Sequence, residues 1–230
     1  MDPNVILRVD QAADLQMAKA FLRYGKYQER FFPKELHVVL DNDVPTRTKD
    51  RHITTYTKQY YDDHFPKITK GVALTKKRWK RFENAFYKLT NRIFDHHPWP
   101  EGDYTGTASI FRMYPRDIRR REFFFPYDCS GHDPLSTIAH EMLHFMFFAY
   151  LYHRFRLRES SRISGKPTEY IWQLSEAFNT VIENWEPYMK LVHATKKIKP
   201  YPECASLYRS LSRSWSTHQS VSKLLQDQLG

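Results

Sequence analysis

Two imidazoles and a carboxylate interrupt one of the most apolar stretches of this chain. Residues 136–147 read STIAHEMLHFMF, so His140, Glu141 and His144 stand among side chains that are typical of a protein core. Burying a polar group costs free energy unless the group finds a partner. The stretch therefore predicts that these three residues meet either hydrogen-bonding partners or a bound ion.

The residues around this stretch predict a buried central helix. Asp133 suits the N-cap, and Pro134 suits the first turn, where its missing N–H costs nothing. Residues 138–152 are apolar on nearly every side of such a helix. Residues four apart on a helix are neighbours on one face, so His140 and His144 can direct their nitrogens to one point.

The pattern His140-Glu141-x-x-His144 is the signature of zinc-dependent peptidases. Both histidines would bind the metal from one helical face. Glu141 would reach the side where water sits, without being a ligand itself. The alternative is structural, with two histidines satisfied by hydrogen bonds in the core and a glutamate at the surface.

A third metal ligand is expected on the next helix, which the sequence predicts from about residue 168 to 186. Glu176 and Glu183 are seven residues apart and share one face of it. Glu176 has apolar neighbours, so we predict it as the third ligand and keep Glu183 as the second choice. Asn179 or Thr180 is the candidate for orienting a ligating histidine.

Other possible third ligands are excluded by position. Phe147 and Tyr150 stand where a metzincin would have glycine and histidine. His153 lies too far along the same helix to turn back to the ion. The remaining downstream histidines, His193 and His218, have no motif around them.

His140-Glu141-x-x-His144, followed by Glu176 on the next long helix, resembles the gluzincins, the thermolysin-like group of zinc metallopeptidases. The resemblance covers about residues 35–187. It implies a zincin-like fold, one Zn²⁺ per chain and hydrolysis of peptide bonds by a zinc-activated water. Glu141 would be the general base of that reaction.

The resemblance has one departure and leaves some roles open. Thr180 stands where many gluzincins carry an aspartate four residues after the ligand. The strand expected within residues 120–128 would pair with an extended substrate, although an ordinary buried strand explains it equally well. Tyr170, Tyr152 and His153 are the alternatives for stabilising the oxyanion, and each is also explained by a structural role.

The remaining sequence predicts a mixture of helices and strands, which places the protein in the α+β class with a small mixed sheet packed on helices. We expect one domain over residues 1–187 and a helical appendage at residues 188–230, packed on the same domain. Residues 46–70 alternate too loosely to assign and predict a strand or a surface segment. Helices are predicted at residues 10–26, 75–94, 201–214 and 217–229, and strands at residues 35–41, 107–114 and 121–127, the last two joined by a basic turn.

The helix at residues 75–94 is predicted to begin at Thr75 and to carry an apolar stripe at Trp79, Phe82, Phe86, Leu89 and Ile93. Its other sides are basic, and the whole chain has a formal charge of +10. Such a surface either faces solvent or contacts nucleic acid or an acidic partner. The chain shows no nucleic-acid-binding sequence motif, so an acidic or nucleic-acid partner belongs to the alternative function, a catalytically silent or latent zincin-fold binding module.

The composition favours a soluble, cytoplasmic protein. The start of the chain lacks a secretory signal pattern, and the longest apolar run, at residues 142–152, is too short to span a membrane. Cys129 and Cys204 are the only cysteines, which fits a reducing compartment and two structural thiols.

Overall fold

The computed structural model describes residues 2–22 and 28–229. Contacts along the chain divide it into two compact units. The sheet unit consists of residues 4–81 and 103–138, and the helical unit consists of residues 2–3, 82–102 and 139–229. Two of the boundaries between the units fall inside helices, α3 (Thr46–Ile93) and α4 (Pro134–Phe155).

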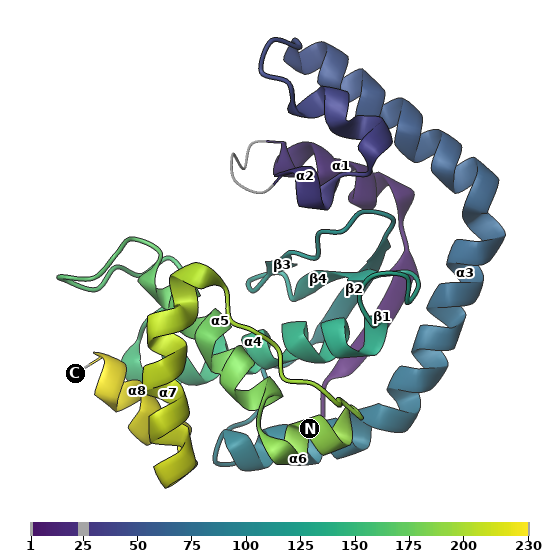
Figure 1. Ribbon diagram of the computed structural model, residues 1–230. Helices are drawn as coiled ribbons and strands as arrows, with labels where there is room; N and C mark the ends of the chain where they lie inside the picture. Colours follow the sequence, from purple (N-terminus) through teal and green to yellow (C-terminus); the bar gives the residue numbers. More distant parts are fainter. Residues whose placement is uncertain (1, 23–27, 230) are drawn as a thin grey trace. The chain divides into compact units, whose positions relative to one another are not determined.

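The sheet unit is built on a four-stranded mixed sheet, which confirms the predicted α+β class (Figure 1). The strands stand in the order β1-β2-β4-β3, with β1 and β4 parallel to β2 and with β3 antiparallel to β4. The register aligns Leu7 with Gly106, and Gly106 in turn with Phe123. The strands are β1 (Asn4–Val9), β2 (Asp103–Ser109), β3 (Arg116–Asp117) and β4 (Glu122–Pro126).

The predicted strands were correct in part. The prediction missed β1, in which Leu7 is buried between more exposed neighbours. The strand predicted at residues 107–114 ends at Ser109, because Phe111 and Met113 leave the sheet and join a separate apolar cluster. Since β2 and β4 are parallel, the basic segment between them is a crossover that contains β3, not a hairpin turn.

That apolar cluster also takes in three short helical segments: α1 (Gln11–Phe21), α2 (Gln28–Phe31) and η1 (Lys34–Leu40). The predicted helix at residues 10–26 is confirmed over α1, while residues 23–26 lie outside the described residues. Asp10 caps α1, because its carboxylate accepts a hydrogen bond of 2.9 Å from the Ala13 amide.

The strand predicted at residues 35–41 was wrong, because this segment is the 3₁₀ helix η1. Leu36 and Val39 are its buried residues. Three residues make one turn of a 3₁₀ helix, so both side chains face the same cluster. In the sequence the same residues form a short β-branched and apolar run, which is also what a strand requires.

The assignment of residues 46–70 to a strand or surface segment was also wrong. These residues begin α3 (Thr46–Ile93), a single helix of 48 residues. Thr75, predicted as an N-cap, is buried inside it. Trp79, Phe82, Phe86 and Ile93 of the predicted stripe are buried, and Leu89 is half-buried. The basic outer face is confirmed, since these side chains are exposed: Lys76, Lys77, Lys80, Arg81 and Lys88.

Asp133 begins α4 (Pro134–Phe155) as predicted. Its carboxylate accepts hydrogen bonds from the amide and the hydroxyl of Ser136, at 3.0 and 3.1 Å. Residues 138–148 of α4 are buried except for the half-buried His140, so the prediction of a buried helix is confirmed.

The helical unit holds the rest of α4 together with α5 (Tyr170–Glu183), where the second helix was predicted. A ring contact joins the two helices, with a centroid distance of 5.1 Å between Phe147 of α4 and Phe178 of α5. Phe178 also contacts Phe94, the residue directly after α3, at 5.5 Å. Eleven of the residues of α5 are buried.

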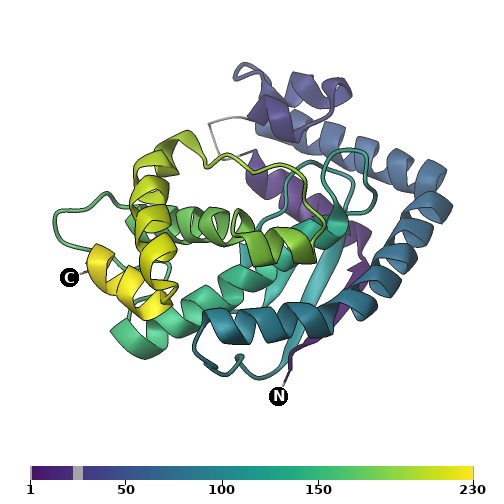
Figure 2. The same ribbon diagram turned by 60° about the horizontal axis from the view of Figure 1, so that its bottom comes forward.

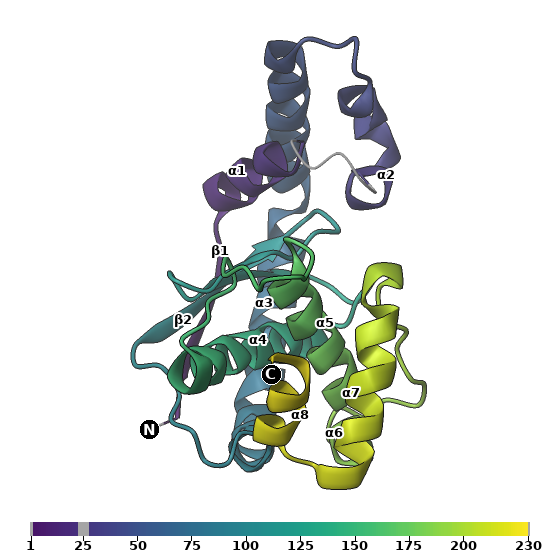
Figure 3. The same cartoon turned by 90° about the vertical axis from the view of Figure 1, so that its left-hand side faces the viewer.

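The chain after α5 forms short helices that pack on it. Pro187 lies in the first turn of α6 (Glu186–Leu191), so it begins a new helix after α5 has ended. Two helices near the end of the chain were predicted and are found as α7 (Ala205–His218) and α8 (Val221–Leu229), preceded by a 3₁₀ turn, η2 (Pro202–Cys204). Helix α7 packs along α5 (Figure 3), and α8 packs on α7 (Figure 2).

Within residues 2–22 and 28–229, no helix combines the length and the apolar character that crossing a membrane would require. Cys129 is exposed and Cys204 is buried, and neither forms a disulfide.

Candidate metal centre

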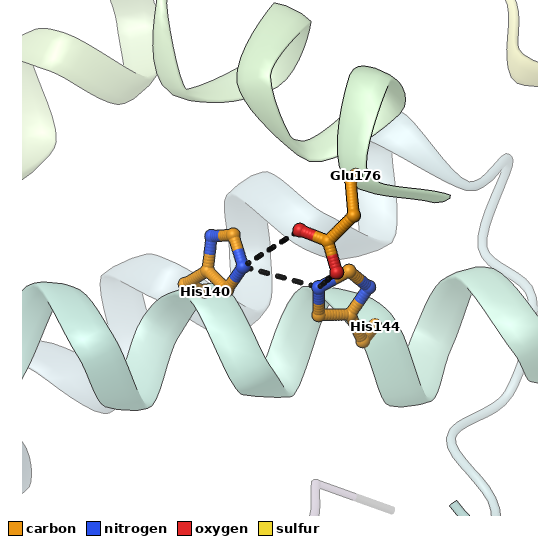
Figure 4. Close-up of side chains that lie close together, drawn as sticks. All are labelled: His140, His144 and Glu176. Atoms are coloured by element: carbon orange, nitrogen blue, oxygen red, sulfur yellow. Dashed lines mark hydrogen bonds and ion pairs between the residues drawn. The ribbon is translucent and has the colours of Figure 1, made fainter. Parts of the chain in front are cut away.

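Helix α4 presents His140 and His144 on one face, one turn apart, toward α5 (Figure 4). Their Nε2 atoms lie 3.1 Å from each other. The two rings stand nearly perpendicular, at 80°. Both histidines of the sequence motif therefore direct the same kind of nitrogen to the same place.

Helix α5 adds the predicted third side chain, Glu176, from the opposite side (Figure 4). One of its carboxylate oxygens lies 3.4 Å from His144 Nε2, and the other lies 3.6 Å from His140 Nε2. One donor atom from each of the three residues can be chosen so that all lie within 4.8 Å of one another.

Two donors that each lie about 2.1 Å from a tetrahedral metal ion are about 3.4 Å apart. The Nε2 atoms of His140 and His144, 3.1 Å apart, are close to that value. With Glu176 included, one donor atom from each residue lies within 4.8 Å of the others. Two imidazoles and one carboxylate are also a donor set that catalytic zinc uses. The three residues are therefore a group that could hold a metal ion.

The cluster is open to solvent at one of its three members. The side chain of His144 is completely buried and that of Glu176 is 6% exposed, whereas that of His140 is 25% exposed. A molecule from solvent would therefore reach the cluster from the side of His140.

A fourth residue, Glu183, holds the other edge of the His140 ring. The Nδ1–H of His140 donates a hydrogen bond of 2.9 Å to Glu183 Oε1. An ionised carboxylate can only accept, so the contact places the proton on Nδ1. In the neutral ring, the lone pair is then on Nε2, the nitrogen that faces His144 and Glu176.

The electrostatic environment of His140 favours its charged form. Burial alone would lower the pKa of the imidazole, but the charge of Glu183 and the contacts with Glu176 and Glu183 raise the pKa well above its usual value. A cation binding at Nε2 would have to displace a proton, so metal uptake at this centre is expected to release protons and to weaken in acid.

Asn179 and Thr180, the residues predicted to orient a histidine ligand, make different contacts. The Asn179 amide donates to the backbone oxygen of His140, and the Thr180 hydroxyl donates to the backbone oxygen of Glu176, both at 2.9 Å. The contact with the imidazole comes from Glu183. Its spacing of seven residues from Glu176 was the sequence signal that placed it on the same face.

Glu141 is buried at 4% exposure and contributes negative charge beside His140. The other polar candidates have neighbours of their own. The ring of His153 lies 4.9 Å from that of His97. The Tyr170 hydroxyl donates to the backbone oxygen of Gln228 at 3.0 Å.

Three further candidates are exposed: Tyr152, His193 and His218. The guanidinium of Arg158 lies over the ring of Tyr152, 5.0 Å from its centroid. The strand predicted within residues 120–128 exists as β4, in the sheet unit. Its pairing with a substrate stays a prediction.

No protein-family model, curated protein or solved structure matches the chain. The function has to be argued from the chemistry of the site itself.

Proposed function

We propose that this protein is a zinc metallopeptidase of the gluzincin type, with a zincin-like fold around the helix that carries His140, Glu141 and His144. The observation that carries the proposal is the convergence of two imidazoles and a carboxylate, of which one donor atom each lies within 4.8 Å of the others. The substrate would be a peptide or protein, because the motif is the one used for hydrolysis of peptide bonds.

Each residue of the centre has a role in the proposed reaction. His140, His144 and Glu176 would hold one zinc ion. Zinc in such a site supplies Lewis-acid chemistry, making water acidic near neutral pH and polarising a carbonyl. Glu141 would accept the proton of the attacking water and deliver it to the leaving amine.

A second function is favoured by the exposed basic face of α3 in the sheet unit, which carries Lys77 and Arg81. The protein could use its zinc site for structure alone, or hold it latent, and bind nucleic acid or an acidic partner through this face. Such binding would weaken steeply with added salt, because it releases counterions.

Measurement of bound zinc and of peptide cleavage separates these functions. We expect about one zinc per purified chain. His140→Ala and His144→Ala should lose the metal and all cleavage of a peptide library. Glu141→Gln should keep the metal and lose at least about 100-fold in cleavage rate, because it removes the general base.

Glu186→Gln is the matched control, since Glu186 is exposed and forms a surface ion pair with Lys190. It should cleave like the unaltered protein. Full activity in Glu141→Gln would refute the role of Glu141. If the zinc-loaded protein cleaves no peptide but binds DNA or RNA, the result would refute the peptidase proposal and support the second function.

A further inference from the structure

We propose that Glu183 is the positioning residue of this centre, which fixes the ring of His140 and thereby sets the affinity for the metal. The inference rests on the proposed zinc site, and it assigns to Glu183 a role distinct from that of a ligand.

The two carboxylates of α5 act on opposite edges of the same imidazole. Glu176 and Glu183 are two helical turns apart, about 10.5 Å along the axis, so they cannot share one position. Glu176 faces Nε2 of His140 at 3.6 Å, and Glu183 accepts from Nδ1 at 2.9 Å. The ring of His140 lies between them. The side-chain amide of Asn179 donates a hydrogen bond to the backbone oxygen of His140.

The contact with Glu183 selects the ligating form of His140. With the proton held on Nδ1, the neutral ring directs the lone pair of Nε2 toward His144 and Glu176. Without this acceptor, the ring would be free to rotate and to carry its proton on either nitrogen. Because the ring is fixed before the metal binds, metal binding does not have to pay the entropy of ordering it.

The burial of Glu183 also points to a role beyond folding. Its side chain is 11% exposed, and its second oxygen, Oε2, is buried with no hydrogen bond in the part of the chain that the structure describes. A carboxylate that is desolvated and only half satisfied is costly to the folded protein. Glutamine has the same size as glutamate and its amide oxygen can still accept from Nδ1 of His140, so Glu183→Gln removes the charge while it keeps the packing.

Metal affinity in three variants tests the proposal: Glu183→Gln, Glu183→Ala and the control Glu186→Gln. Zinc affinity would be measured by competition with a chromophoric chelator, and the geometry of the site by the visible absorption of bound Co²⁺. We expect Glu183→Ala to weaken zinc binding by about 10- to 100-fold, Glu183→Gln to lose less, and both to alter the Co²⁺ spectrum. Glu186→Gln removes the same charge from an exposed position and should stay within about twofold of the unaltered protein.

The outcomes keep the two proposals apart. An unaltered protein that binds neither zinc nor Co²⁺ would overturn the proposed function itself. An unaltered protein that binds zinc, together with unchanged affinity and spectrum in both Glu183 variants, would overturn only the positioning role. Should Glu183→Ala fail to fold by circular dichroism, Glu183→Gln carries the test, and unchanged binding in that variant is decisive against the proposal.

Discussion

Asp14 shows at the scale of a single residue what burial does to a carboxyl group in this protein. It is completely buried, and its Oδ2 accepts hydrogen bonds from the Tyr61 hydroxyl and the Ile110 amide, both at 3.0 Å. Burial raises the pKa of Asp14 to about 7, although hydrogen bonds from Ser109, Ile110 and Tyr61 favour its charged form. The carboxyl group is therefore largely protonated below neutral pH.

This pKa predicts a pH dependence of folding. The pKa in the folded protein lies above its ordinary value of 3.8, so the contribution of Asp14 to stability is fully present below about pH 4. It is lost as the pH rises to about 7. A pKa difference of one is worth about 1.4 kcal/mol, so the loss amounts to a few kcal/mol.

Asp14→Asn isolates this contribution, because the amide oxygen can still accept from Tyr61 and Ile110 but does not titrate. The free energy of unfolding of the unaltered protein should fall relative to that of Asp14→Asn between pH 4 and pH 7. The measurement is urea unfolding of both metal-free proteins at several pH values. A difference that stays constant across this range would contradict the raised pKa.

Gly71 shows at the scale of an element how closely α3 approaches the chain after β4. It lies inside the helix, where glycine is less favourable than alanine by about 1 kcal/mol. A Cβ atom at this position would lie 2.1 Å from the backbone oxygen of Tyr127. The glycine therefore permits a contact that no other residue allows.

Gly71→Ala should destabilise the protein in spite of its better helix propensity. We expect a loss of about 1 to 3 kcal/mol in the free energy of unfolding, the usual cost of inserting an extra group into a packed site. Gly131→Ala is the matched control, because its new Cβ would meet nothing within 4 Å and should change stability by less than about 0.5 kcal/mol. A more stable Gly71→Ala, in urea unfolding of both variants, would contradict the close approach.

The proposed metal centre would act at the scale of the whole molecule, because its three side chains come from two successive helices. His140 and His144 come from α4, and Glu176 comes from α5. An ion held by all three side chains binds only the folded protein, so it should stabilise the helical unit by mass action.

Zinc at 100 times its dissociation constant should stabilise the fold by about 2.7 kcal/mol. For a chain of this size, that corresponds to a rise in Tm of about 5 to 10 °C. Thermal unfolding with added zinc and with a chelator measures the difference. The zinc-dependent rise should vanish in His144→Ala, and an equal rise in that variant would place the binding of zinc somewhere else.

The features predicted correctly from the sequence depend on neighbours along the chain. Asp133 caps α4 because its carboxylate reaches an amide three residues on. The spacing of four residues between His140 and His144 places both on one helical face. The face shared by Glu176 and Glu183 follows from the same periodicity. These relations are local, so the sequence alone determined them.

Contacts between distant segments decided the rest. Residues 46–70 are helical because Ile53, Thr57 and Tyr61 recur at helical spacing on a buried face, although the polar Thr57 interrupts the apolar pattern and hid the stripe. The parallel pairing of β1 and β4 with β2 joins segments far apart in the chain.

The contact between Glu183 and His140 shows the same division within the candidate metal centre. Helical periodicity put Glu183 on the face of α5 that carries Glu176. Only the packing of α5 on α4 decided which edge of the His140 ring Glu183 meets. The sequence by itself determined which residues share a helical face, since backbone geometry repeats along the chain. The tertiary structure alone decided which faces meet, since that depends on packing side chains from the whole chain at once.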